Sequence, residues 1–104
     1  MPCVFIPNKN SNNYDAARAI GPLRYLTSGS LDIFDVASMC RSIQTALATS
    51  GPDDMLIISS LQVLNAIAAG ILGYKHGVLN LLLFRNEKYI RRRIDLRAIA
   101  QVVT

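Results

Sequence analysis

The sequence predicts an α/β protein with a two-layer or three-layer arrangement around one sheet of about five strands. Its expected core is a parallel β-α-β-α-β unit, followed by a C-terminal antiparallel hairpin strand. Two apolar runs, residues 55–58 and 79–84, flank a segment long enough to form a helix and return the chain to the same end of the sheet. Such a crossover makes the two strands parallel and the connection right-handed. At 104 residues, the chain (1–104) has the size of one domain.

The N-terminal part supplies the remaining strands of this core. Residues 3–6 predict a first strand, and the turn-forming residues 8–13 predict an exposed loop after it. Residues 14–20 predict one or two helical turns. Residues 23–27 predict a second strand, which the segment 28–30 ends.

The sequence predicts a first long helix over residues 32–49. Ser30 or Asp32 is the expected N-cap, and the sequence Ser50-Gly51-Pro52 ends the helix. Apolar residues at helical spacing predict an inward-facing stripe made of Ile33, Val36, Ala37, Cys40, Ile43 and Leu47.

The second helix, residues 61–75, is apolar nearly all round. A helix of this kind is covered on more than one side, either by the sheet and the first helix or by another subunit. Gly77 is the expected C′ residue, with Lys75 and His76 placed against the negative helix end.

The C-terminal part predicts a tight hairpin turn over residues 84–89 and an antiparallel strand over residues 89–96. On that strand, Ile90, Arg92 and Ile94 share one face. The tail, residues 98–104, is compatible with a strand or a helical turn.

The composition favours association with other molecules. Apolar residues make up 51% of the chain and charged residues only 17%, so we expect a homodimer or larger assembly that buries apolar surface. The formal charge is +4, and residues 85–97 alone supply +4 from six basic and two acidic residues. A basic segment of this kind suits an anionic partner.

Hydroxyl and basic side chains are expected to meet at one edge of the sheet. The carboxyl ends of parallel strands lie together, and ligands of open α/β sheets bind outside those ends. Helix N-termini at that edge favour phosphate. The alternative is that the serines cap helices and the cations solvate a turn. The predicted ligand-binding residues are Thr27, Ser28, Ser30, Ser59, Ser60, Arg85 and Lys88.

The run Arg91-Arg92-Arg93 is a second candidate site, for nucleic acid. Arg91 and Arg93 point one way and Arg92 the other, so Arg92 either extends outward from an edge strand or pairs with an acidic group across an interface. Tyr89 next to this run could stack on a base. The alternative is that the arginines protect an edge strand from aggregation.

The sequence predicts no catalytic residue, metal site or cofactor. His76 is the only histidine, Cys3 and Cys40 fit no metal spacing and are expected to be buried reduced thiols, and Asp53-Asp54 is expected to accept hydrogen bonds in a turn. No signal segment opens the sequence, and the apolar run 61–74 is too short to span a bilayer. We therefore expect a cytoplasmic protein without a membrane partner.

Two segments, residues 56–68 and 75–96, resemble those of small proteins encoded by phages and mobile elements. The resemblance implies no activity. By architecture alone, a small α/β dimer with a polar strand-end site is also similar to viral proteins that bind or degrade cyclic oligonucleotides.

Three functions are compatible with these features. The first is a non-enzymatic, homo-oligomeric protein that binds a phosphate-bearing ligand, either a nucleic acid or a nucleotide. The second is a metal-independent nuclease or cyclic-nucleotide phosphodiesterase. The third is a viral protein–protein interaction factor. The basic segment and the polar strand ends favour the first.

Overall fold

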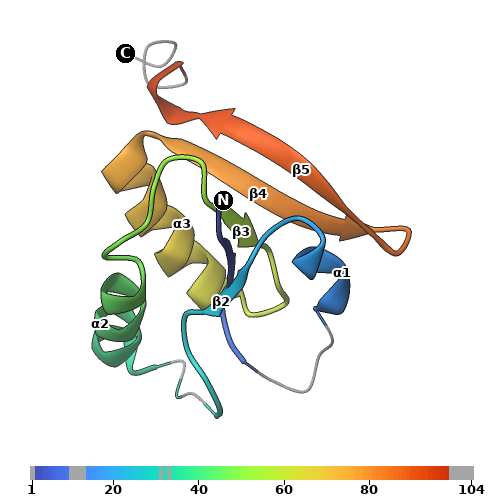
Figure 1. Ribbon diagram of the computed structural model, residues 1–104. Helices are drawn as coiled ribbons and strands as arrows, with labels where there is room; N and C mark the ends of the chain where they lie inside the picture. The colour runs from blue at the N-terminus through green and yellow to red at the C-terminus, as the bar shows by residue number, and fades with distance from the viewer. Residues whose placement is uncertain (1, 10–13, 31, 33, 99–104) are drawn as a thin grey trace.

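The computed structural model describes residues 2–9, 14–30, 32 and 34–98, and it contains one five-stranded sheet with the order β2-β1-β3-β4-β5 (Figure 1). The first four strands of that order are mutually parallel, and β5 is antiparallel to β4. The predicted fold class is therefore confirmed, including the C-terminal antiparallel strand. The strands are β1 Val4–Ile6, β2 Leu23–Tyr25, β3 Met55–Ile57, β4 Val78–Arg85 and β5 Lys88–Asp95.

The helices lie on both faces of the sheet and make a three-layer arrangement. They are α1 Asp15–Arg18, α2 Val36–Ala46 and α3 Gln62–His76. On one face, which we call the α2–α3 face, Phe5 and Leu56 pack against α2 and α3. On the other, the α1 face, Ile6 and Ile57 pack with Tyr14 and α1. The two faces are covered unequally, because α1 has 4 residues whereas α3 has 15.

The strand order creates a topological switch point between β1 and β3. The chain leaves β1 through α1 toward β2, and it leaves β3 through α3 toward β4, which lies on the opposite side. The segments that follow β1 and β3 therefore diverge. In open α/β sheets, a crevice opens at this point, outside the carboxyl ends of the strands.

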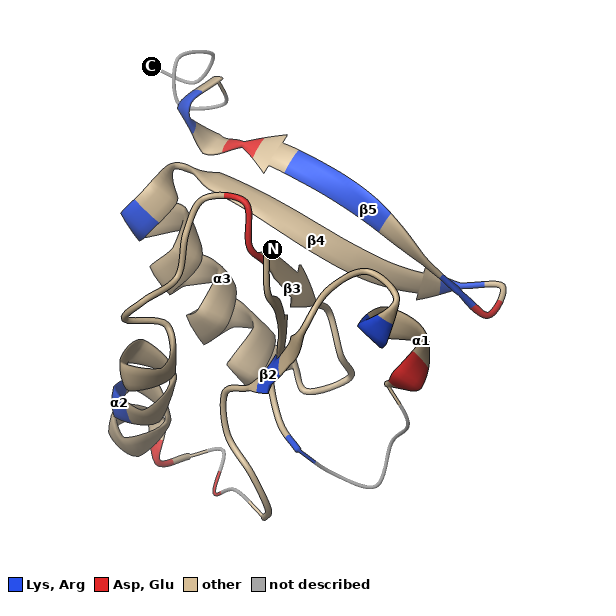
Figure 2. Ribbon diagram, in the orientation of Figure 1, with Lys and Arg blue, Asp and Glu red and all other residues tan. Residues whose placement is uncertain are grey.

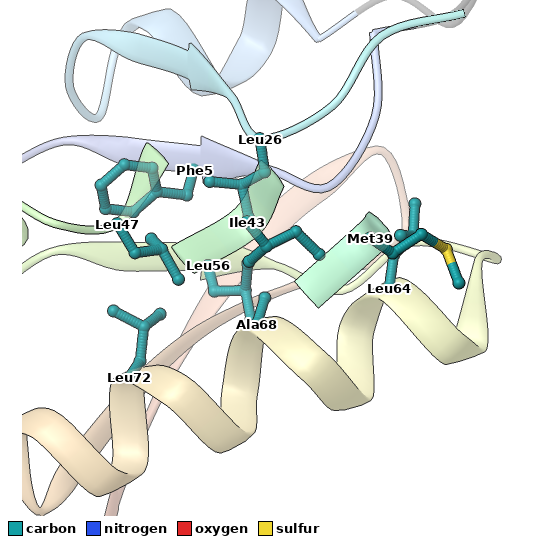
Figure 3. Close-up of a cluster of buried hydrophobic side chains, with 9 residues drawn as sticks. All are labelled: Phe5, Leu26, Met39, Ile43, Leu47, Leu56, Leu64, Ala68 and Leu72. Atoms are coloured by element: carbon teal, nitrogen blue, oxygen red, sulfur yellow. The ribbon is translucent and has the colours of Figure 1, made fainter. Parts of the chain in front are cut away.

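The larger part of the core lies between the sheet and the two long helices (Figure 3). Leu56 of β3 is at its centre and has no exposed surface. Burying side chains of this size contributes about 1.5–3 kcal/mol each to stability, so this cluster is the main source of folding free energy. Its members are Phe5, Leu26, Met39, Ile43, Leu47, Leu56, Leu64, Ala68 and Leu72.

Helix α2 begins later than the sequence predicted. Asp35 is the N-cap, and its Oδ1 accepts a hydrogen bond from the Ser38 N–H at 3.2 Å. The predicted caps, Ser30 and Asp32, are wrong because the Asp32 carboxylate instead accepts from the Phe34 N–H at 2.9 Å and holds a separate turn.

The buried stripe of α2 is correspondingly shifted. Met39, Ile43 and Leu47 are buried, whereas Val36 and Ala37, which were expected inside, are exposed. The late start of the helix leaves its first turn beyond the edge of the core. Ile33, also predicted in the stripe, lies outside the described residues.

The end of α3 agrees with the predicted glycine cap. Gly77 has a φ of 72°, and its N–H donates to the Gly73 carbonyl at 2.8 Å. Lys75 acts differently from the prediction, because its Nζ donates to the Leu47 carbonyl at 2.7 Å and the Ala48 carbonyl at 3.1 Å. It therefore caps the C-terminus of α2 and ties the two helices together.

The predicted hairpin is confirmed, with Arg85 paired to Lys88 across a two-residue turn. Asn86 and Glu87 have φ values of 52° and 63°, as a type I′ turn requires. The predicted exposed loop over residues 8–13 is wrong at its first residue, because Asn8 is only 7% exposed. Residues 10–13, and the tail beyond Ala98, lie outside the described residues.

Within the described residues, no helix has both the length and the apolar character needed to cross a bilayer.

Candidate functional site

The turn between β3 and α3 separates two hollows at the carboxyl edge of the sheet. Ser59 is held there by Asn65, whose Nδ2 donates to the Ser59 carbonyl at 2.7 Å and whose Oδ1 accepts from the Ser59 N–H at 3.2 Å. The Ser59 hydroxyl also accepts from the Leu61 N–H at 3.1 Å. Ser60 is exposed and lines both hollows. Ser59 thus fixes the turn, whereas the Ser60 side chain is accessible from both hollows.

The first hollow lies at the switch point and has a volume of about 400 Å³. It is lined by Asn8, Gly29, Ser60 and the first turn of α3, residues 61–64. No described residue accepts a hydrogen bond from the N–H groups of residues 62–64, and no side chain caps this helix end. The hollow combines mostly apolar walls with backbone donors at one end.

The predicted strand-end residues are only partly brought together. Ser60 lines the first hollow beside Gly29, which follows Ser28. The Thr27 hydroxyl hydrogen-bonds to the Pro7 carbonyl at 2.7 Å and to the Asn8 Oδ1 at 2.9 Å, so it joins the ends of β1 and β2. These hydroxyls come from segments far apart in sequence, as the parallel topology requires.

The other predicted members do not line this hollow. Ser28 forms an isolated bridge with Lys9, and Ser30 is exposed. Arg85 and Lys88 are exposed at the hairpin end and line neither hollow. The reason is strand length, because β4 runs three residues beyond Leu82, the partner of the last residue of β3.

Two arginines converge on one buried oxygen on the α1 face. The Asn80 Oδ1 accepts from Arg91 Nη2 at 3.3 Å and from Arg93 Nη1 at 3.2 Å. Asn80 is 3% exposed, and its Nδ2 donates to the Pro52 carbonyl at 2.8 Å. A neutral amide therefore holds two guanidinium groups close together, although both side chains remain at the surface.

This arginine pair is only weakly neutralised. Arg93 Nη1 lies 3.9 Å from the Asp53 carboxylate, with side chains that are 54% and 72% exposed. Exposed ion pairs of this kind contribute about 0–1 kcal/mol. Figure 2 shows the basic run along β5, with the nearest acidic residue of that strand, Asp95, at its end.

Arg92 lies on the opposite face of β5. It pairs with Leu81, its neighbours on that face are Ile90 and Ile94, and its Nη1 donates to the Arg91 carbonyl at 2.9 Å. Since β5 is an edge strand and Arg92 is exposed, the side chain extends outward from the sheet. The other alternative, pairing with an acidic group across an interface, stays a prediction.

Aromatic rings continue the α1 face toward the hairpin. Phe84 pairs with Tyr89, and their ring centroids are 5.0 Å apart at an interplanar angle of 59°. Side chains alternate along a strand, so Tyr89, Arg91 and Arg93 share one face. We call the set Phe84, Tyr89, Arg91 and Arg93 the arginine–aromatic strip.

The second hollow adjoins this strip and has a volume of about 370 Å³. Tyr14, Phe84 and Tyr89 form its aromatic walls, and Ser59 and Ser60 form its polar rim. Burial raises the pKa of the Tyr89 hydroxyl above its usual value of 10.0, and the neighbouring Tyr14 raises it further. The Tyr89 ring is therefore a neutral, half-buried surface next to two cations.

Sequence reasoning missed two residues that shape these sites. Asn80 interrupts the otherwise apolar run of β4, and a single amide in such a run is a signal for a buried hydrogen-bonding role. Phe84 was assigned to the end of a strand and the start of a turn but to no site, although its 59% exposure makes it an accessible aromatic ring. The two contacts of Asn80 with Arg91 and Arg93 could not be assigned before the pairing register of β5 was known.

His76 and Asp54 have structural partners. The His76 Nε2 lies 2.9 Å from the Ser50 hydroxyl, and the Asp54 carboxylate accepts from the N–H groups of Cys3 and Gly51 at 2.8 Å each. Cys3 and Cys40 are free thiols and half-buried rather than buried. Within the described ranges, no three metal-ligating side chains form a group.

Comparison with protein-family models, with curated proteins and with solved structures found no match for this chain.

Proposed function

We propose that this protein binds nucleic acid through the arginine–aromatic strip on its α1 face. The observation that supports the proposal is the convergence of Arg91 and Arg93 on the Asn80 oxygen. Two guanidinium groups held side by side offer several N–H donors to one phosphate, and such charge-assisted bonds are strong. The proposal does not include Arg92, because its side chain lies on the other face.

The geometry favours a phosphate-bearing ligand over simple protection of an edge strand. An edge-protecting arginine only needs to be charged and exposed. Here a buried asparagine instead fixes the positions of two arginines that would otherwise repel one another. Aromatic rings on the same face add a surface for bases, as in proteins that bind single strands.

The test compares arginines on opposite faces of the same strand. In Arg91→Ala/Arg93→Ala, affinity for a short oligonucleotide should fall at every salt concentration. The slope of log affinity against log salt should fall by at least about 0.7, the contribution of one phosphate contact in a single strand. Arg92→Ala is the matched control and should leave most of the slope, although it removes a charge from the same strand. Fluorescence anisotropy of a labelled oligonucleotide measures both quantities.

Equal losses in the double variant and in Arg92→Ala would contradict a site on the α1 face. Unchanged affinity in the double variant would leave the arginines as protection of the edge strand. The proposal is for binding without turnover, so cleavage of the oligonucleotide in the presence of a chelator would favour the metal-independent nuclease instead.

A second candidate is the binding of a nucleotide in the switch-point hollow. It is favoured by the position of a hollow of about 400 Å³ at the site where open α/β sheets bind ligands. Adding a nucleoside monophosphate should shift the backbone amide NMR signals of Gln62 and Val63, and the shifts should persist in Arg91→Ala/Arg93→Ala. Signals that stay unchanged at millimolar ligand would exclude this candidate.

The Arg85 contact predicted from the sequence can be tested in the same titration. Loss of one charged hydrogen bond in Arg85→Ala would weaken nucleotide binding by about 10- to 150-fold. Unchanged affinity would show that the exposed hairpin end does not reach the hollow.

We also propose that the protein self-associates through α3. Val63 and Tyr74 are 36% and 95% exposed, and between them Ala66 and Gly70 leave space on the same side of the helix. Lys75 is turned toward the end of α2, so it does not place a charge over this stripe. A second copy is the expected occupant, because the small residues of one stripe can accept the Tyr74 ring of the other.

Sedimentation at micromolar concentration should show a dimer or larger assembly. Gly70→Glu should dissociate it, because the variant places a carboxylate in the stripe at a position with open space. Ser42→Glu, which adds the same charge to the exposed side of α2, is the control. A monomer in the unmodified protein would contradict this proposal.

A further inference from the structure

The hollow beside the arginine–aromatic strip has the properties of a binding site for one nucleobase. Its apolar lining consists of the rings of Tyr14, Phe84 and Tyr89 together with Ile57 and Ile58, and its volume is about 370 Å³. Tyr89 lies two residues before Arg91 and four before Arg93 on the same face of β5, so the hollow lies about 13 Å along the strand from Asn80, on which the two guanidinium groups converge.

We infer that this hollow holds one unpaired base of a bound strand, so that the protein selects single-stranded over double-stranded nucleic acid. The inference rests on the proposed function, because the arginine pair on the same face of the sheet supplies a phosphate contact farther along the bound strand. A base can enter such a hollow only when it is not stacked and paired within a duplex.

The composition of the hollow suits a nucleobase. Each base has a π-face that stacks on Tyr or Phe, and stacking supplies affinity with little dependence on base identity. No described residue hydrogen-bonds to the Ser60 hydroxyl, which lies on the rim and can donate to or accept from a base edge. The hollow should therefore accept different bases with similar affinity.

Phe84 is the most suitable residue for a test, because its side chain is 59% exposed and contributes little to the core. In Phe84→Ala, affinity for a short oligothymidylate should fall about 5- to 140-fold, the range that stacking of one base supplies. Affinity for the same strand paired with oligoadenylate should change less than twofold. The preference for the single strand should thus be reduced or lost.

Two variants control for indirect effects. Leu83→Ala, next in sequence but on the α2–α3 face, is 37% exposed and should change neither affinity. Phe84→Tyr keeps an aromatic ring at the rim and should retain the single-strand preference. Far-ultraviolet circular dichroism shows whether each variant is folded, and if Phe84→Ala is not, Phe84→Leu replaces it.

The outcomes separate this inference from the proposed function. If Arg91→Ala/Arg93→Ala weakens binding but Phe84→Ala does not, the phosphate contact stands and the base hollow is wrong. Equal losses for single-stranded and paired probes in Phe84→Ala would also overturn the inference. If the unmodified protein binds neither probe, the proposed function itself fails.

Discussion

The two faces of the sheet differ in what covers them. On the α2–α3 face, two helices bury Phe5 and Leu56 in a cluster of nine side chains. On the α1 face, a helix of 4 residues covers β1 and β3, and the adjoining part of β4 and β5 carries arginines and aromatic rings. Figures 1 and 2 show this contrast as the two helices α2 and α3 on one side and the short helix α1 near β5 on the other.

The difference shows how a small domain can separate the face that stabilises it from the face that we propose for binding. The α2–α3 face supplies most of the buried apolar surface, and this allows β4 and β5 to extend past the shorter strands. On the α1 face, the extended part of the hairpin offers charge and aromatic surface without interrupting the main core. Substitutions on the α2–α3 face should therefore lower mainly the free energy of unfolding, and substitutions on the α1 face should lower mainly the affinity for an oligonucleotide.

The largest expected effect is a difference between adjacent residues of β3. Leu56 and Ile57 are 0% and 2% exposed and point to opposite faces. Substitution of either by alanine costs about 2–5 kcal/mol, depending on how well the site can collapse. Leu56→Ala should lie near the top of this range because two helices hold its surroundings in place, and Ile57→Ala should lie near the bottom. Urea unfolding measures both free energies.

Val36→Ala is a suitable control for that comparison, because Val36 is apolar but 49% exposed, and it should change stability by less than about 0.5 kcal/mol. An Ile57→Ala variant as destabilised as Leu56→Ala would show that both faces contribute equally to the core.

The next prediction concerns Asn80, which we expect to contribute both to the free energy of unfolding and to the affinity for an oligonucleotide. In Asn80→Ala, the Pro52 carbonyl loses its donor, so the free energy of unfolding should fall by about 1–3 kcal/mol. Arg91 and Arg93 also lose their shared acceptor, and affinity for an oligonucleotide should fall about 5- to 140-fold as two side chains become free to move.

A double-variant cycle separates these two effects. In an Arg91→Ala/Arg93→Ala background, Asn80→Ala should still lower stability but should change affinity no further. An additional loss of affinity in that background would mean that Asn80 contacts the ligand directly or shapes another part of the site.

Much of the fold could be predicted from the sequence, because apolar periodicity and turn residues determine it locally. The long helix, its Gly77 cap, the parallel strands and the hairpin follow from such local patterns. The start of α2 could not be predicted in this way, because both Asp32 and Asp35 can cap a helix. Only the tertiary position of the core selects Asp35.

The site was less predictable, because it depends on lengths and register rather than on residue types. Ser59 and Ser60 were correctly placed at the carboxyl end of β3, but the extra length of β4 takes Arg85 past the hollows. That Arg91 and Arg93 lie on the same face follows from the alternation of side chains along a strand. Their convergence on Asn80 requires the register between β4 and β5, which no local pattern in the sequence specifies.

The smallest expected effect concerns the ionisation of Tyr89, whose pKa is raised above 10.0 first by burial and second by Tyr14. A folded-state pKa above the unfolded value contributes stability that is fully present below pH 10 and is lost as the pH rises through the folded pKa. Ultraviolet titration should therefore show a phenolate component with a midpoint above 10 that is absent in Tyr89→Phe. In Phe84→Ala, this midpoint should move down toward 10, because the ring that covers Tyr89 at 5.0 Å is removed. A midpoint that does not change would mean that Phe84 does not shield the hydroxyl, and that the aromatic end of the α1 face is more open to water than the hollow implies.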